Sequence, residues 1–86
     1  MTQKIDIVAA FKQAAFEAEG RHLDGLTLDS KLSELSMDSV AVMELVSYFE
    51  EKLRVRIPDE ELSKIRTVRD LRDTIARLAP DKQFAA

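Results

Sequence analysis

Glycine and proline are so scarce in this chain that they constrain its fold more than any other feature. Among 86 residues there are two glycines, Gly20 and Gly25, and two prolines, Pro58 and Pro80. A sheet with many tight turns needs more of both residues, so their scarcity favours helices. Apolar residues also recur at three- and four-residue steps, as they do along one face of a helix. We therefore expect an all-α protein.

Four segments carry this helical pattern, and the third of them is short. Residues 20–37, between the first two segments, form a long first loop in which leucines are spaced as apolar anchors. One domain is expected over residues 1–79. Residues 80–86 follow a proline that ends the last helix, and we expect them to form a flexible tail. The predicted helices cover about residues 4–19, 38–52, 59–64 and 67–79.

Composition and length disfavour several classes of function. The net charge of −3 argues against nucleic-acid binding, and the absence of Cys and the single His22 leave no disulfide framework and no zinc cluster. No apolar run reaches the length of a membrane span, and the first residues lack the apolar core of a signal peptide, so a cytoplasmic location is expected. A chain this short buries only roughly 64% of its unfolded surface. It is expected to be a monomer that carries or binds something for larger partners, without metal or catalytic residues of its own.

One local pattern, Leu35-Ser36-Met37-Asp38-Ser39-Val40, points to chemistry. It places a serine hydroxyl in the first turn of the second predicted helix, directly after Asp38, which is a good N-cap. The free N–H groups and the dipole at a helix N-terminus stabilise a phosphate, so Ser39 suits a phosphoester. No base accompanies Ser39 in the sequence, so it is better interpreted as a modification site than as a nucleophile of hydrolysis. On physical grounds alone, simple capping of the helix by both residues is the favoured alternative.

This motif and the sequence after it resemble acyl carrier proteins. The resemblance implies a four-helix bundle with a short third helix, which agrees with the predicted segments. It also implies that Ser39 receives 4′-phosphopantetheine from coenzyme A through a phosphopantetheinyl transferase, and that the arm then holds an acyl group as a thioester. Such a chain is a carrier, not an enzyme, and its other partners are acyl-loading and chain-processing enzymes. The resemblance rests on Leu35–Val40, Glu44–Val46, Phe49–Leu53, Ile57–Glu61, Lys64–Ile65 and Thr67–Val68.

The resemblance assigns two further sets of residues. A surface on or beside the second helix is expected to dock partner enzymes, with solubilising surface charges as the alternative. A pocket between the second and third helices is expected to take an acyl chain, with a closed core as the alternative. Because the Phe49 ring fills space at that level, we expect a medium-length chain to enter only partly. The docking residues are Asp38, Val40, Met43, Glu44, Ser47, Glu50 and Glu51, and the pocket residues are Val46, Phe49, Leu62, Ile65, Leu71 and Ile75.

The chain departs from the family pattern in ways that point to a specialised pathway. Ser36 stands where a glycine is usual, Ala41 stands where an acid is frequent, and the overall charge is only mildly acidic. Residues 66–86 carry five basic and three acidic side chains, a net charge of +2. We interpret these basic side chains as an ordinary solvated face, with a set of partners different from that of the housekeeping synthase as the alternative. A polyketide-like or unusual acyl-chain pathway is expected rather than housekeeping fatty acid synthesis. The alternatives are an aminoacyl or peptidyl carrier that uses the same arm, and a small helical adaptor without a prosthetic group.

Overall fold

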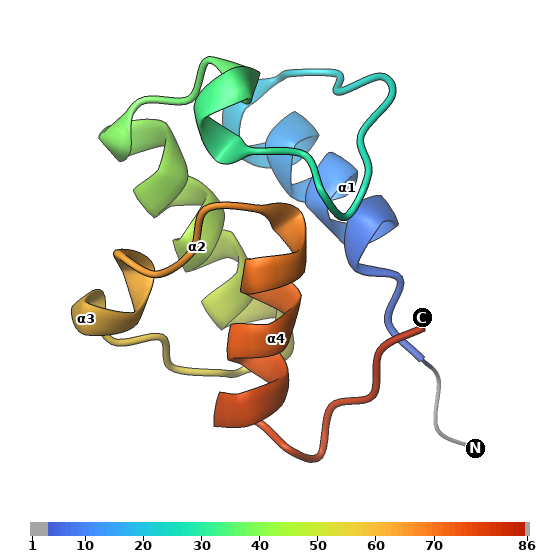
Figure 1. Ribbon diagram of the computed structural model, residues 1–86, viewed down its shortest axis with the longest axis vertical. Coiled ribbons are helices and arrows are strands. Elements are labelled where there is room, and N and C mark those ends of the chain that lie inside the picture. The colour runs from blue at the N-terminus through green and yellow to red at the C-terminus, as the bar shows by residue number, and fades with distance from the viewer. Residues whose placement is uncertain (1–3, 86) are drawn as a thin grey trace.

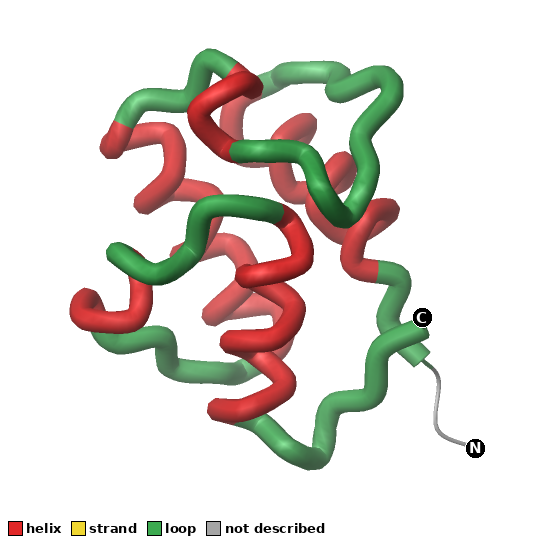
Figure 2. Tube along the Cα trace, in the orientation of Figure 1, coloured by secondary structure: helices red, strands yellow, loops and turns green. Residues whose placement is uncertain are grey.

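A computed structural model describes residues 4–85 of the chain, and its regular structure is helical (Figures 1 and 2). This confirms the all-α fold class. A 3₁₀ turn, η1, lies within the long first loop, and two isolated β-bridges are the extended pairings of the described residues. The elements in order are α1 (Ile7–Glu19), η1 (Leu32–Leu35), α2 (Ser39–Leu53), α3 (Asp59–Leu62) and α4 (Val68–Leu78).

Side-chain caps set where the helices begin. The Asp38 carboxylate accepts a 2.8 Å hydrogen bond from the Ala41 amide, and Thr67 and Asp70 form a reciprocal capping box at α4. The first helix begins at Ile7 rather than near residue 4, because Asp6 has extended backbone and caps it. Gly20 ends α1 in the left-handed region (φ 64°), as the sequence indicated.

The core lies where α1 packs against both α2 and α4. Phe11 of α1 and Phe49 of α2 face each other with ring centroids 6.3 Å apart. The third helix is shorter than expected, with four residues in place of six, and the chain after it continues as a turn. The largest side chains that are almost completely buried come from the three long helices and are Ile7, Phe11, Leu45, Phe49, Val68, Leu71 and Ile75.

The long first loop is held against the start of α4 by backbone hydrogen bonds. The Leu32 amide donates to the Arg66 carbonyl at 2.9 Å, and the Arg69 amide donates to the Leu28 carbonyl at 2.8 Å. Arg69 also forms a 2.7 Å ion pair with Asp29 of the loop. The buried side chains of Leu26 and Leu32 anchor the same loop in the core. The segment that leads to Ser39 is therefore fixed at several points.

The C-terminal segment differs from the flexible tail that the sequence predicted. The Ile5 amide donates to the Gln83 carbonyl at 2.7 Å, and the Ala85 amide donates to the Ile5 carbonyl at 2.9 Å. Phe84 is half-buried against the core. The described chain ends lie close together for this reason (Figure 1). An aromatic side chain six residues after the last residue of α4 supplies an anchor that composition alone does not reveal. Ala86, the last residue of the predicted tail, is outside the described residues.

Candidate functional site

Ser39 is the first residue of α2, and its side chain is exposed. Asp38 precedes it with extended backbone (φ −79°, ψ 179°), and the Asp38 carbonyl accepts from the Val42 amide at 3.0 Å. The first turn of a 15-residue helix carries a partial positive charge that favours an anion at this point. The predicted position of Ser39 at a helix start is thus confirmed, and its geometry suits a phosphoester.

The backbone turn before Ser39 has a strained conformation, and hydrogen bonds from Arg21, which is distant in sequence, stabilise it. Ser36 has φ 57° and ψ 37°, in the left-handed region that glycine adopts at least cost. The Arg21 guanidinium, at the end of α1, donates to the Leu35 carbonyl at 2.5 Å and to the Ser36 carbonyl at 3.3 Å. Ser36, which stands where acyl carrier proteins usually have glycine, therefore has a backbone conformation that glycine would adopt at lower cost.

The Ser39 side chain borders a surface groove of about 460 Å³ between η1, α2 and α3, which we call the Ser39 groove. Two of the predicted acyl-pocket residues, Leu62 and Ile65, border it. The other four, Val46, Phe49, Leu71 and Ile75, are buried in the core. The six predicted pocket residues therefore do not surround one common cavity in this structure. This arrangement is the one that the closed-core alternative describes. The groove is also lined by Leu32, Ser33, Met37, Asp38, Val42, Met43 and Ser63.

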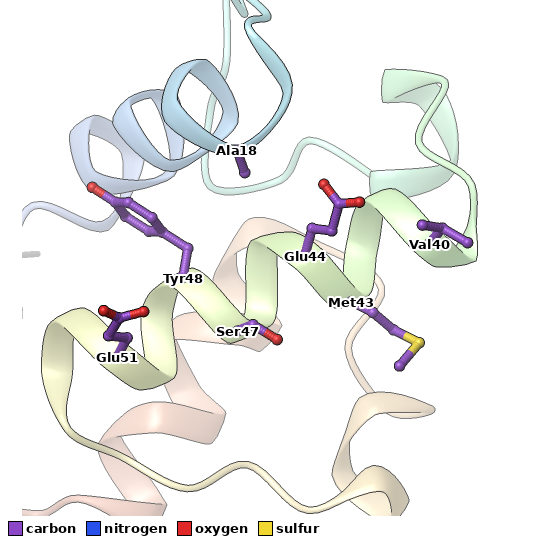
Figure 3. A pocket seen from close by; sticks show the side chains of 7 residues that line it. All are labelled: Ala18, Val40, Met43, Glu44, Ser47, Tyr48 and Glu51. Atoms are coloured by element: carbon purple, nitrogen blue, oxygen red, sulfur yellow. The ribbon is translucent and has the colours of Figure 1, made fainter.

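A second hollow of about 580 Å³ lies along α2 and the end of α1, and we call it the α2 depression (Figure 3). Tyr48 and Glu44 point towards α1, whereas Met43 points away from it (Figure 3). Val40 and Met43 are 61% and 58% exposed, which is unusual for large apolar side chains. The depression is lined by Ala18, Val40, Met43, Glu44, Ser47, Tyr48 and Glu51.

Five of the seven predicted docking residues thus lie together at the α2 depression, whereas Asp38 and Glu50 do not. Asp38 borders the Ser39 groove and caps α2. The Glu50 carboxylate accepts a 2.8 Å hydrogen bond from the Ile57 amide, so it supports the α2–α3 connection instead. Sequence reasoning missed Ala18 and Tyr48 as lining residues. The Tyr48 hydroxyl donates to the Glu17 carboxylate of α1, which together with partial burial raises the pKa of Tyr48 to about 12. No local pattern signals a contact between residues 31 positions apart.

Carboxyl groups of α1 and α2 meet at this surface. A hydrogen bond with Glu44 raises the pKa of Glu19 above its ordinary 4.5, and desolvation and the charges of Glu44 and Asp38 act in the same direction. The Arg21 charge opposes this shift without cancelling it. A concentration of negative charge therefore lies beside the start of α2.

We expect Glu19→Gln to raise the melting temperature at pH 7. Because the folded protein holds the Glu19 proton more tightly than the unfolded chain, ionisation destabilises the fold as pH rises through the unfolded and then the folded pKa. Glutamine cannot ionise, and its amide can donate to Glu44. The gain should therefore disappear as pH falls below 4.5. Thermal unfolding between pH 3.5 and 8 measures it, with exposed Glu34→Gln as the control. A gain in melting temperature that persists at low pH would show that it does not arise from the ionisation of Glu19 beside Glu44.

Comparison with known proteins places the chain in a family. The family described as "Phosphopantetheine attachment site" matches residues 9–75. The acyl carrier protein of Arthrobacter sp. (strain FB24) is 36% identical over 77 residues, which cover 88% of this chain and 95% of that protein. The actinorhodin polyketide synthase acyl carrier protein of Streptomyces coelicolor is 34% identical over 70 residues and 81% of each chain. The chain belongs to the acyl carrier protein family, whose cofactor is covalently attached 4′-phosphopantetheine.

A solved structure supports the same assignment. The crystal structure of the acyl carrier protein from Thermotoga maritima superimposes with a TM-score of 0.80 and 37% sequence identity, and the match covers 87% of this chain and 88% of that one. Within residues 4–85, no helix is long and apolar enough to cross a membrane, and no three potential metal-ligating side chains gather.

Proposed function

We propose that this protein carries acyl intermediates as thioesters on a 4′-phosphopantetheine arm attached to Ser39. The observation that carries the proposal is the exposed Ser39 hydroxyl in the first turn of α2, at the edge of the Ser39 groove. Ser30, Ser33 and Ser36 precede it in the sequence, but none of them begins an α-helix. The helix dipole favours the phosphate of the arm at Ser39, and the groove offers apolar surface beside it.

Attachment requires Ser39 to act as the acceptor in a transfer from coenzyme A. The Ser39 oxygen forms a bond to phosphorus, the pyrophosphate P–O bond breaks, and the nucleotide leaves with the electron pair. The Ser39 hydroxyl proton passes to a base of the phosphopantetheinyl transferase. The single histidine of this chain, His22, packs against Phe16 at 4.9 Å between ring centroids and does not line the Ser39 groove. When bound, the arm supplies a terminal thiol for acyl transfer, and this chain supplies the tether point and the partner surface.

Intact mass spectrometry after co-expression with a broad-specificity transferase tests the proposal. We expect a mass increase equal to one phosphopantetheinyl group. A bare chain mass would instead favour a helical adaptor without a prosthetic group. Incubation of the modified protein with acyl and aminoacyl donors and their loading enzymes then separates an acyl carrier from an aminoacyl or peptidyl carrier.

We also propose a specialised fatty-acid-like or polyketide pathway for the cargo. The net charge of −3 and the likeness to a relative named as a polyketide synthase acyl carrier protein support this proposal. The α4 arginines do not form one free basic face: Arg69 pairs with Asp29, Arg72 with Asp73 and Arg77 with Glu61. We therefore assign partner docking to the α2 depression and not to α4.

Docking at the α2 depression should depend on Glu44. We expect Glu44→Lys to slow modification by the transferase about three- to tenfold at low salt, because it replaces attraction to a basic partner by repulsion. Added salt should reduce the difference, since exposed charges are screened. Initial rates at several salt concentrations measure it. Asp24→Lys reverses a charge on an exposed loop residue outside the depression and serves as the control. Equal rates for Glu44→Lys and the unaltered protein at low salt would remove Glu44 from the interface.

The cargo is expected to remain mostly at the surface. Since Val46, Phe49, Leu71 and Ile75 are packed in the core, an eight-carbon chain should occupy the Ser39 groove and enter the core only partly. Amide chemical shifts of the arm-only and octanoyl forms measure this. Changes concentrated near Ser39, Leu62 and Ile65 are expected. Large changes that extend through residues 46 and 71 would show full entry and contradict the prediction.

A further inference from the structure

We propose that Arg21 positions Ser39 for modification by holding the left-handed turn at Ser36 in place. This inference rests on the proposed attachment at Ser39 and adds a residue to that site. The guanidinium of Arg21, just after the end of α1, connects α1 to the turn that leads into α2.

Arg21 is rigidly placed at its backbone. Gly20 closes α1 in the left-handed region, and the Arg21 amide donates to the Ala15 carbonyl at 3.2 Å. This hydrogen bond reaches back six residues and closes the end of α1 across the left-handed turn at Gly20. The base of the Arg21 side chain is therefore fixed relative to α1, and α1 packs against α2.

The guanidinium joins two consecutive carbonyl groups, those of Leu35 and Ser36, at 2.5 and 3.3 Å. A planar fork of donors suits this arrangement, and a lysine ammonium reproduces it poorly. Both carbonyls belong to the turn in which Ser36 has φ 57°. A residue with a Cβ adopts this conformation at a cost, so the turn persists only where its surroundings impose it.

The turn decides where Ser39 points. Met37 and Asp38 alone separate Ser36 from Ser39, and Asp38 caps the helix through the Ala41 amide. If the Ser36 carbonyl leaves Arg21, the segment can relax towards ordinary backbone angles, and the Asp38 cap and the Ser39 hydroxyl shift with it. A small displacement of a reacting group is enough to slow a transfer that depends on alignment.

The test is a double-mutant cycle that uses glycine to relieve the turn. Arg21→Gln removes the double hydrogen bond, and Ser36→Gly removes the conformational cost, because glycine adopts this region freely. We expect Arg21→Gln to lower kcat for arm transfer to Ser39 by roughly three- to tenfold with little change in KM. Ser36→Gly alone should leave kcat unchanged. In the Ser36→Gly background, Arg21→Gln should lower kcat much less than it does in the serine background. Arg21→Lys should retain only part of the kcat of the unaltered protein.

Two controls separate positioning from charge and from global stability. Arg56→Gln makes the same charge change at an exposed residue between α2 and α3, and its rate should equal that of the unaltered protein. Rates are measured where circular dichroism shows each variant folded. Hydrogen exchange of the Ala41 and Val42 amides in the unmodified protein gives a readout independent of attachment, and Arg21→Gln should accelerate it several-fold.

The outcomes distinguish this inference from the proposed function. Unchanged kcat and unchanged exchange in folded Arg21→Gln would overturn the positioning role of Arg21, while modification of Ser39 would stand. Equal slowing in the serine and glycine backgrounds would overturn the role of the turn. No modification of the unaltered protein at all would overturn the proposed attachment, and the positioning inference would fall with it.

Discussion

We expect Ser39→Ala to abolish phosphopantetheinylation and to leave the fold intact. The hydroxyl is the proposed point of attachment, so its removal leaves the transferase without an acceptor. The stability should change little because Ser39 is exposed and Asp38 keeps its 2.8 Å capping hydrogen bond to the Ala41 amide. Intact mass spectrometry after incubation with coenzyme A and a transferase measures the modification. Circular dichroism and thermal unfolding verify the fold.

Ser33→Ala is the matched control for this experiment. Ser33 is exposed and borders the same groove, but it lies in η1 and not at the start of an α-helix. We expect the Ser33→Ala protein to gain the full mass of one arm at the rate of the unaltered protein. Label that persists on Ser39→Ala would move the attachment to another serine and contradict the proposed site.

Phe49→Ala should lower the free energy of unfolding by about 3–5 kcal/mol, the range for removing a large buried aromatic side chain. Phe49 is 1% exposed and contacts the rings of Phe11 and Tyr48, at centroid distances of 6.3 and 6.1 Å. For a small domain this is a large part of the total stability. Urea unfolding with a comparison of m-values measures the loss. Phe16→Ala removes the same ring from a site that is 48% exposed, and it should cost far less.

The same variant tests how the core limits the cargo. Removing the ring leaves apolar space within the core cluster that includes Val46 and Leu71, and a saturated chain on the arm can fill such a space. Octanoyl loading should therefore stabilise Phe49→Ala more than it stabilises the unaltered protein, by linkage between binding and folding. Equal stabilisation of both proteins would show that Phe49 does not control entry. Phe49→Leu, which removes less volume, should give an intermediate result.

The positions of the helices and of the candidate attachment serine follow from local sequence. Asp38 and the Thr67–Asp70 pair cap the helices they precede, and Gly20 ends α1, because these effects involve groups within a few residues of each other. For the same reason Ser39 could be placed in a first helical turn before the fold was known. The family resemblance, and not helix physics, distinguished this serine from an ordinary capping residue.

Long-range contacts decided what local pattern could not. The spacing on α2 puts Glu50 near the other docking residues, but the Ile57 amide seven residues away draws its carboxylate to the α2–α3 connection. The C-terminal segment pairs with Ile5, which lies at the opposite end of the chain. Arg21 reaches the Ser36 turn across 15 positions. Local sequence by itself thus determined the helices, their caps and the place of Ser39. The tertiary structure alone decided which side chains surround Ser39, because such contacts depend on how the helices pack and not on sequence spacing.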